Sequence, residues 1–271
     1  MYNNTQYDQH LHSSLSFDGE KDLTIAGIVD IAAGRGLAGI AVTDHYDPLW
    51  PDDVFPSTLD VTAYEKALTE AEIYSAGRIR FSKGVEIGFL TGEANDLCEK
   101  VVGAYPYDFV IGALHYSEKT PIDYPAYVEG RSIKDTIDEY YTLTLETIKE
   151  YKNYDIIGHI NCIDRYTDGF APESLYMPYI DEVLRAVIAD GKGIEINTSS
   201  FRYGIGERGT PTGPILNRFK ELGGEILTIG SDAHKAADIG AYIKEGEEML
   251  LAAGIPYVAV FSERRAEFIK L

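Results

Sequence analysis

The stretch GIAVTDH at residues 39–45 decides how this chain folds. Its first four residues are small or aliphatic, and its polar residues come only at the end. A short strand that is apolar on both faces is typical of a parallel sheet covered on both sides. The preceding residues 23–35 have a helical pattern that stops at Gly36, the usual left-handed end of a helix. The helix, its stop and the buried strand together predict one unit of an α/β fold.

The same alternation continues along the whole chain. The short apolar runs that we expect to be buried strands cover residues 7–13, 39–45, 81–89, 109–116, 155–161, 193–198 and 225–232, with an eighth at 257–261. The expected helices cover residues 23–35, 61–75, 93–102, 132–152, 173–189, 214–222 and 239–253. About seven strand–helix units without a linker or a repeat predict one domain over residues 1–271 and favour a parallel α/β barrel. An open doubly wound sheet is the structural alternative.

The composition is that of an ordinary globular protein with an acidic surface. The net charge of −20, from 44 acidic against 24 basic residues, argues against a non-specific nucleic-acid or anionic-membrane surface. The two cysteines have no metal-type spacing, and residues 1–6 lack the basic and apolar regions of a signal peptide. No apolar run is long enough to cross a bilayer. We therefore expect a cytoplasmic protein with no membrane or nucleic-acid partner, and leave its oligomeric state open.

All six histidines stand on, or just beyond, the C-terminal end of an expected strand. They are His10, His12, His45, His115, His159 and His234. In a parallel barrel these strand ends form one face, so the six imidazoles would meet there. His10 and His12 alternate along a strand, so their side chains point to the same side and suit one metal ion. A lone strand-end histidine is often a structural residue, but six in this position predict a metal centre.

Three carboxylates fit the same centre. Glu86 lies inside an apolar strand, where a charge is costly unless it binds a metal ion or forms a buried ion pair with an arginine, which is the alternative. Asp232 alternates with His234 and shares its side. Asp18 follows the first expected strand just before Gly19, where it is equally compatible with an ordinary turn. Nitrogen and oxygen donors without a thiolate suit iron and manganese as well as zinc.

Taken in chain order, these residues resemble the polymerase and histidinol phosphatase (PHP) superfamily. The matching pieces are His10-x-His12, Asp18, Thr43-Asp44-His45, Val85-Glu86, Leu114-His115, Gly158-His159 and Ser231-Asp232-Ala233-His234. Each piece is weak alone, but their order is specific and spans nearly the whole chain. The resemblance implies a single PHP-type metal-dependent phosphoesterase domain over residues 1–271. It also implies a distorted (β/α)7 barrel, similar to a TIM barrel, that carries three divalent metal ions (zinc, iron or manganese).

The resemblance further implies a ligand set for the three ions. The first ion would be held by His10, His12, Glu86 and Asp232. The second ion would share Glu86 and be held by His115 and His159. The third ion would be held by Asp18, His45 and His234. Many relatives have a histidine where this chain has Asp18, so the third site is where the chain departs from the family pattern.

For activity, the resemblance implies a phosphomonoesterase. The size of the chain and its segments around Arg165 and Arg202 are similar to the family members that hydrolyse L-histidinol phosphate in histidine biosynthesis. The attacking group would be a hydroxide shared by two metal ions, whose charge lowers the pKa of bound water toward neutrality. The expected catalytic side chains are Asp232, His234 and Glu86, and Asp232 is a candidate to accept the proton of the water.

Two arginines are expected to bind the phosphate group. Arg165 follows the fifth expected strand and Arg202 follows the sixth, and a guanidinium matches phosphate through two hydrogen bonds. From position alone, either arginine is equally compatible with an exposed surface residue. His45 and His115 are expected to contact the phosphate as well.

The organic part of the substrate leaves a weaker signal. Histidinol phosphate carries an ammonium and an imidazole, which suit a pocket of acidic and aromatic groups. The aromatic candidates are Phe17, Tyr46, Tyr116 and Phe201, and residues 117–131 are a candidate cover for the site. Glu195 and Asn197 alternate on the sixth strand, either to orient a ligand histidine or simply to fill the barrel interior.

Two other functions remain compatible with these residues. The first is a PHP-type phosphoesterase that acts on a nucleotide or a nucleic-acid end, against which the acidic composition counts. The second is a metal-binding module without catalysis, which would have little reason to keep a complete ligand set.

Overall fold

The computed structural model describes residues 6–51, 59–117, 120–167, 169–205 and 209–271. Its centre is a parallel sheet in the order β1-β2-β4-β5-β6-β7-β8, with the short β3 pairing with β4. The strands are β1 (Tyr7–Leu11), β2 (Gly39–Val42), β3 (His45–Tyr46), β4 (Arg80–Gly88), β5 (Phe109–Ala113), β6 (Ile156–Ile157), β7 (Gly193–Asn197) and β8 (Leu227–Gly230). Their order in the sheet follows their order in the chain, as in a barrel.

The sheet curls until its two ends meet. Leu11 and Ala233 form an isolated parallel bridge between β1 and the segment that follows β8. The N–H of His12 donates to the carbonyl oxygen of Ala233 at 3.0 Å, and the N–H of Asp232 donates to that of His10 at 2.9 Å. This nearly closed ring of seven parallel strands confirms the distorted (β/α)7 barrel and excludes the open doubly wound sheet.

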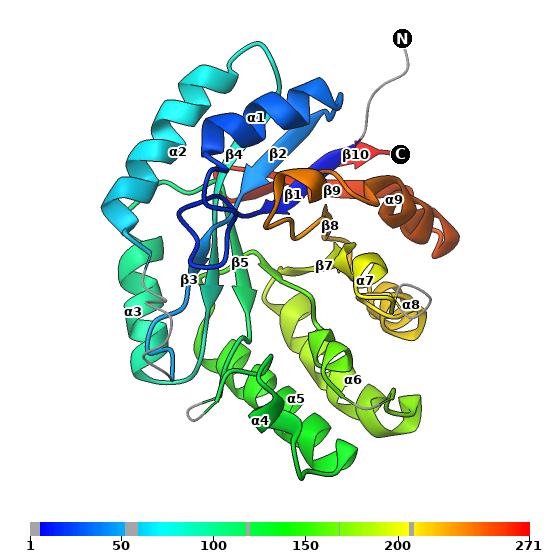
Figure 1. Cartoon of the computed structure of the whole chain (residues 1–271). Helices are drawn as coiled ribbons and strands as arrows, with labels where there is room; N and C mark the ends of the chain where they lie inside the picture. The colour runs from blue at the N-terminus through cyan, green and yellow to red at the C-terminus, as the bar shows by residue number, and fades with distance from the viewer. Residues whose placement is uncertain (1–5, 52–58, 118–119, 168, 206–208) are drawn as a thin grey trace.

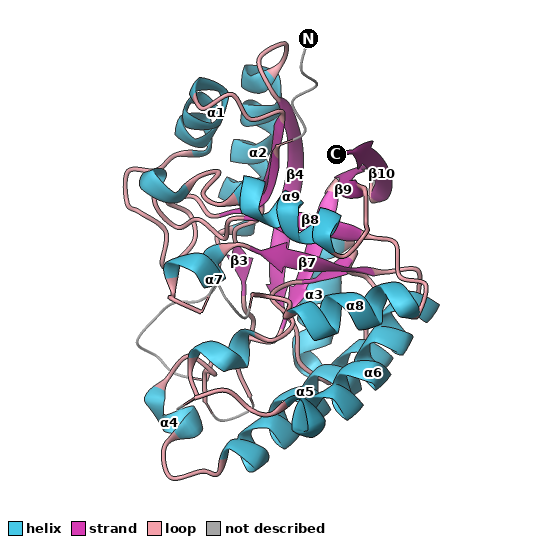
Figure 2. Ribbon diagram, turned by 90° about the vertical axis from the view of Figure 1, so that its right-hand side faces the viewer, coloured by secondary structure: helices cyan, strands magenta, loops and turns pink. Residues whose placement is uncertain are grey.

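Helices surround the strands in chain order, from α1 and α2 through α5 to α8 and α9 (Figure 1). They are α1 (Ile25–Gly34), α2 (Val61–Ser75), α3 (Glu93–Val102), α4 (Pro125–Val128), α5 (Ile133–Glu150), α6 (Glu173–Ala189), α7 (Ser199–Arg202), α8 (Gly213–Glu221) and α9 (Ile243–Ala252). Figure 2 shows α5 and α6 side by side on the outside of the sheet. None of the helices in the described part of the chain is both long and apolar enough to span a membrane.

The helix ends follow local chemistry. The hydroxyl of Thr24 accepts from the N–H of Gly27 at 3.1 Å, which caps α1, and the hydroxyl of Ser132 caps α5 in the same way. The expected helix at 239–253 begins only at Ile243, because Gly240 has a φ of +73°, which no α-helix continues. The four-residue helices α4 and α7 lack the length to give a periodic signal in the sequence.

The eighth apolar run is a strand, but the parallel pairing that its apolar composition predicts is wrong. β9 (Tyr257–Ser262) pairs antiparallel with β10 (Arg265–Lys270) in a separate two-stranded sheet. Glu263 and Arg264 both have positive φ angles, 49° and 62°, which make the tight two-residue turn of a hairpin. Because the chain turns back at this point, β9 and β10 cannot extend the parallel sheet.

This hairpin covers the end of the barrel where the strands begin. The ring of Phe261 stacks on that of Phe109 at 4.8 Å, beside Ala41 and Ile156. The amide of Gln9 donates to the carbonyl oxygen of Ala259 at 2.7 Å. The histidine-bearing strand ends are therefore the open end of the barrel.

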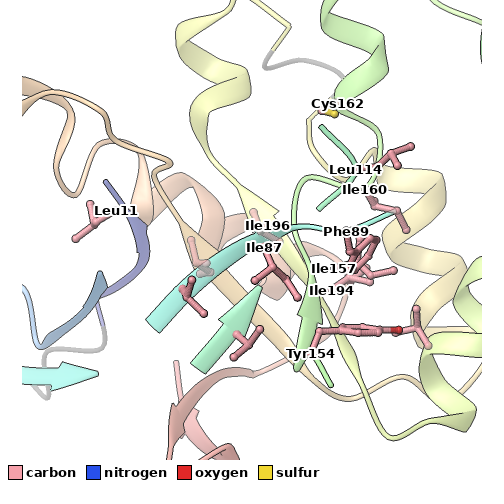
Figure 3. Close-up of a cluster of buried hydrophobic side chains, with 14 of the residues drawn as sticks. Leu11, Ile87, Phe89, Leu114, Tyr154, Ile157, Ile160, Cys162, Ile194 and Ile196 are labelled. Atoms are coloured by element: carbon pink, nitrogen blue, oxygen red, sulfur yellow. The ribbon is translucent and has the colours of Figure 1, made fainter. Parts of the chain in front are cut away.

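Alternation along the strands separates the apolar core from the barrel interior. Ile194 and Ile196 on β7 belong to the main apolar core, as does Ile87 on β4 (Figure 3). The residues between or beside them, Glu195 and Glu86, then face the inside of the barrel. On β4 and β7 the fold thus directs Glu86 and Glu195 to the interior and the neighbouring isoleucines to the helices.

Candidate active site

Glu86 lies at the centre of the histidine cluster. Its side chain is fully buried on β4. Glu86 Oε1 lies 3.0 Å from His159 Nε2 and 3.2 Å from His115 Nε2. Glu86 Oε2 lies 3.0 Å from both His10 Nε2 and His45 Nδ1. Among the described residues its close partners are imidazoles and none is an arginine, so the alternative of a buried arginine pair finds no support in this geometry.

Asp232 and His234 join the cluster from the segment after β8. Asp232 Oδ1 lies 3.5 Å from His12 Nε2 and 3.6 Å from His234 Nδ1. Asp18 Oδ2 lies 2.9 Å from His234 Nε2 and 3.7 Å from His45 Nε2. The fold therefore brings together all nine residues expected to bind metal ions.

Three groups of these residues have ligand atoms within 4.8 Å of one another. They are His10, His12 and Glu86; His12, His45 and His234; and His45, Glu86 and His115. The first group matches part of the first expected site. The third crosses the expected partition, because His45 approaches Glu86 as well as Asp18. The division of ligands among ions stays a prediction.

Two buried ring nitrogens of the cluster fit a metal ion better than a direct hydrogen bond. His12 Nε2 and His45 Nδ1 make no hydrogen bond to any residue that the structure describes. Acidic oxygens nevertheless lie 3.5 Å from the first and 3.0 Å from the second. A buried polar atom without a hydrogen bond is costly, and a cation shared between the imidazole and the carboxylate would satisfy both.

The electrostatics of the cluster also suit cations. Burial alone would raise the pKa of the Glu86 carboxyl, but His10, His45 and His115 hold it well below its usual range. Burial would lower the pKa of His45, but Glu86 and Asp18 raise it to about 9. The carboxylates thus stay ionised and attract protons to imidazoles in the absence of metal. Metal ions would have to displace those protons, so we expect metal affinity to fall as the pH falls.

Two cluster residues have an unusual backbone. The φ angles are +25° at His159 and +54° at Asp232, a region that costs a non-glycine residue roughly 1–3 kcal/mol. Arg202 donates to the carbonyl oxygens of Ser231 and Asp232, at 2.7 and 2.9 Å. These two bonds stabilise the strained segment that carries Asp232.

Two polar residues of β7 form hydrogen bonds with residues of the cluster. Glu195 Oε1 lies 2.7 Å from His10 Nδ1, and Glu195 Oε2 accepts from the N–H of His159 at 3.0 Å. Asn197 Nδ2 donates to Asp232 Oδ2 at 3.2 Å. Both residues are buried in the barrel interior and also orient cluster residues. The two roles that the sequence left as alternatives, filling the interior and orienting a ligand histidine, therefore both apply.

Asp47 is a site residue that the sequence analysis missed. Its side chain is fully buried, and its Oδ1 lies 2.7 Å from His115 Nδ1. It lies outside the expected strands, two residues after His45, in the segment HYDP. The signal that could have found it is the alternation of His45 and Asp47, which puts both on one side of an extended segment.

The two arginines have different places. Arg165 lines the cavity above the cluster and donates to Asn197 Oδ1 at 3.1 Å and to Ser199 Oγ at 2.7 Å. Its Nη1 lies 3.7 Å from Asp232 Oδ2. Arg202 is not among the cavity residues that the structure describes, because its guanidinium is turned toward backbone carbonyls. Phosphate binding by either arginine stays a prediction.

A cavity of about 140 Å³ opens over the cluster. Of the four expected aromatic residues only Phe17 lines it. Tyr116 is buried against the backbone of β4, and Phe201 stacks on Tyr242 elsewhere. The other aromatic residues that line the cavity are Trp50, Tyr166 and Tyr203. From the expected cover at 117–131, Ile122 and Asp123 reach the cavity, while residues 118–119 lie outside the described residues.

The family follows from comparison with known sequences. The family model described as "PHP domain" matches residues 8–199, which carry seven of the nine cluster residues. The chain belongs to the PHP domain family. The PHP resemblance expected from the sequence is therefore confirmed.

Relatives of this PHP chain match it beyond the family model. A probable histidinol-phosphatase from Clostridium acetobutylicum is 30% identical over 96% of this chain and 97% of its own length. A histidinol-phosphatase from Lactococcus lactis subsp. lactis is 27% identical over 94% of each chain. A solved structure, histidinol phosphate phosphatase from Lactococcus lactis complexed with zinc, L-histidinol and phosphate, has a TM-score of 0.87 at 25% identity and covers 97% of this chain and 99% of that one.

Proposed function

We propose that this PHP domain hydrolyses L-histidinol phosphate to L-histidinol and phosphate. The observation that carries the proposal is the cluster of six histidines and three carboxylates at the floor of a cavity whose wall bears Arg165. The relatives named histidinol-phosphatase, and the Lactococcus structure with zinc, L-histidinol and phosphate, support this substrate. We place the reaction in cytoplasmic histidine biosynthesis, which the free thiols of Cys98 and Cys162 suit.

Three divalent metal ions complete the proposed site. The first would be held by His10, His12, Glu86 and Asp232, the second by Glu86, His115 and His159, and the third by Asp18, His45 and His234. When bound, such ions lower the pKa of a water molecule and neutralise charge on the phosphate oxygens. Zinc, iron and manganese all suit this donor set, and the zinc in the Lactococcus structure favours zinc.

The protein's own groups then position the phosphate and move the protons. Arg165 supplies a cation on the cavity wall that can bind two phosphate oxygens. Asp232 is the group that we propose to accept the proton of the attacking water. His10, His12 and His234 hold the pKa of its buried carboxyl well below the usual range, so the carboxylate is ionised and carries no proton of its own. Attack on phosphorus breaks the bond to the ester oxygen, that oxygen takes up the proton released by the water, and histidinol leaves as the alcohol. His234 and Glu86 complete the proposed catalytic set, with His45 and His115 beside the phosphate.

Asp123 is the group that we assign to the organic part of the substrate. The other carboxylates that line the cavity, Asp18, Asp47 and Asp232, contact histidines. Asp123 makes no hydrogen bond or ion pair with another residue in the described part of the chain. Histidinol phosphate brings an ammonium and an imidazole to this cavity, and a carboxylate next to Tyr166 would attract either cation.

A panel of phosphate esters tests the proposed function. The metal-loaded protein is assayed for phosphate release from L-histidinol phosphate, a nucleoside monophosphate and 4-nitrophenyl phosphate. We expect kcat/KM to be highest for L-histidinol phosphate. Equal values for all three esters would refute the biosynthetic assignment, and a preference for the nucleotide would favour the nucleotide phosphoesterase. Bound metal without hydrolysis of any ester would favour the non-catalytic module.

A further inference from the structure

We propose that Asp47 is a positioning residue that fixes which nitrogen of His115 faces the metal ions, and that Gly88 is required to seat it. The inference rests on the proposed metal centre but not on the identity of the ester. Asp47 itself is outside the proposed ligand set.

The hydrogen bond between Asp47 and His115 sets the tautomer of the imidazole. A carboxylate only accepts hydrogen bonds, so Asp47 Oδ1, at 2.7 Å, keeps the proton of neutral His115 on Nδ1. The unprotonated Nε2 is then the nitrogen that faces the cluster, 3.2 Å from Glu86 Oε1. A metal-binding histidine whose other nitrogen is held by a carboxylate has a fixed ring orientation and greater basicity.

A second pair in the same site has the same arrangement. Glu195 Oε1 lies 2.7 Å from His10 Nδ1, and His10 Nε2 lies 3.0 Å from Glu86 Oε2. Two buried carboxylates from different parts of the chain thus each hold the Nδ1 of a histidine whose Nε2 faces a different oxygen of Glu86. Two such pairs around Glu86 indicate a support for metal binding, because each one leaves the unprotonated Nε2 of its histidine facing the centre of the cluster.

Gly88 gives Asp47 its place against β4. A methyl group at position 88 would lie 1.7 Å from Asp47 Oδ1 and 2.7 Å from its Cγ. It would also lie 3.1 Å from Cε1 of the buried Tyr116. The carboxylate therefore packs directly on the backbone of the strand that carries Glu86. Any side chain at position 88 would push Asp47 away from His115.

The test compares Asp47→Ala and Asp47→Asn with Asp155→Asn. Asp155 is a matched control because it is also buried, accepts from the N–H of Val110 at 2.8 Å and pairs with Arg264, but at the closed end of the barrel. Zinc affinity is measured by competition with a chelator, and the position of the proton on His115 by ¹⁵N NMR of the zinc-loaded protein. Both readouts are independent of hydrolysis.

We expect Asp47→Ala to weaken zinc binding about 10- to 100-fold, the usual effect of losing such a partner, and to let His115 populate both tautomers. Asp47→Asn, whose carbonyl oxygen still accepts the hydrogen bond, should retain most of the affinity. Gly88→Ala should weaken zinc binding in the same direction as Asp47→Ala. Asp155→Asn should lower the melting temperature and leave zinc affinity unchanged.

The proposal is overturned if Asp47→Ala lowers the melting temperature as Asp155→Asn does but binds zinc with wild-type affinity and keeps His115 protonated on Nδ1. Failure of the proposed substrate would appear differently. In that case the wild-type protein would fail to prefer L-histidinol phosphate, while the zinc affinities of the variants would still separate.

Discussion

Gly230, the last residue of β8, is a sensitive position because the histidine cluster packs directly on it. A methyl group there would lie 2.3 Å from Cβ of His10 and 2.5 Å from Glu195 Oε1. It would also lie 3.1 Å from the backbone nitrogen of His10. Two carbon atoms that are not bonded to each other cannot lie 2.3 Å apart. Cβ of His10 cannot move away by a change of rotamer, because it is attached directly to the backbone of β1. Gly230→Ala must therefore separate β8 from β1 or displace the His10–Glu195 pair.

The expected magnitude follows from these contacts. Overpacking a closely packed interior costs about 1–3 kcal/mol, which for a chain of this size lowers the melting temperature by roughly 2–4 °C per kcal/mol. Displacing the bond between Glu195 and His10 Nδ1 should weaken metal binding about 10- to 100-fold, as for other partners of metal-bound histidines. Gly230→Ala should thus lose stability and metal affinity together.

Thermal unfolding of the metal-free protein and chelator competition measure the two effects. Gly34→Ala is the matched control, because the added methyl group would have no atom within 4 Å apart from its chain neighbours and the backbone of its own helix, of which Gly34 is the last residue. Alanine is favoured over glycine in a helix by up to about 1 kcal/mol, so this control should be neutral or slightly more stable. The reasoning is refuted if Gly230→Ala matches the control in both measurements.

Asp18→Asn should lower the metal content by one ion out of three, because Asp18 Oδ2 lies 2.9 Å from His234 Nε2; an unchanged count in elemental analysis would remove Asp18 from the ligand set. Asp123→Asn should raise the KM for L-histidinol phosphate about 2- to 5-fold, the change expected from losing a partly exposed ion pair, and leave the KM for 4-nitrophenyl phosphate, whose organic part carries no charge, unchanged. An equal rise for both esters would contradict the role of Asp123. Arg165→Ala should lower kcat/KM roughly 10- to 150-fold through the loss of a charged hydrogen bond to phosphate. Arg202→Ala tests the second arginine, and an unchanged inhibition constant for inorganic phosphate would limit Arg202 to holding the backbone of Asp232.

The sequence determined most of the fold because its signals are local. Each buried strand is a short apolar run, and each major helix has a periodic face with a capping residue or a stopping glycine. The exception is β9, where an apolar run of the same composition turns back into a hairpin. Its partner β10 consists of exposed residues such as Arg265 and Glu267 and partly buried ones, so it contains no apolar run that would predict a strand. The antiparallel pairing of β9 depends on the tight turn at Glu263 and Arg264 that follows it. The composition of the strand itself does not reveal that turn.

The sequence also determined which residues meet at the open end of the barrel. The C-terminal ends of parallel strands meet on one face of a barrel, independently of how the loops fold. The positions of six histidines and three carboxylates therefore sufficed to predict the cluster around Glu86. Only the tertiary structure decided how the cluster is supported and which groups face the cavity. Asp47, Asp123 and Arg202 lie in loops or at helix ends, where side-chain direction depends on packing between segments far apart in the chain. Arg202 turns to the backbone of Asp232 for that reason, whereas Asp47 reaches His115 because Gly88 leaves it room.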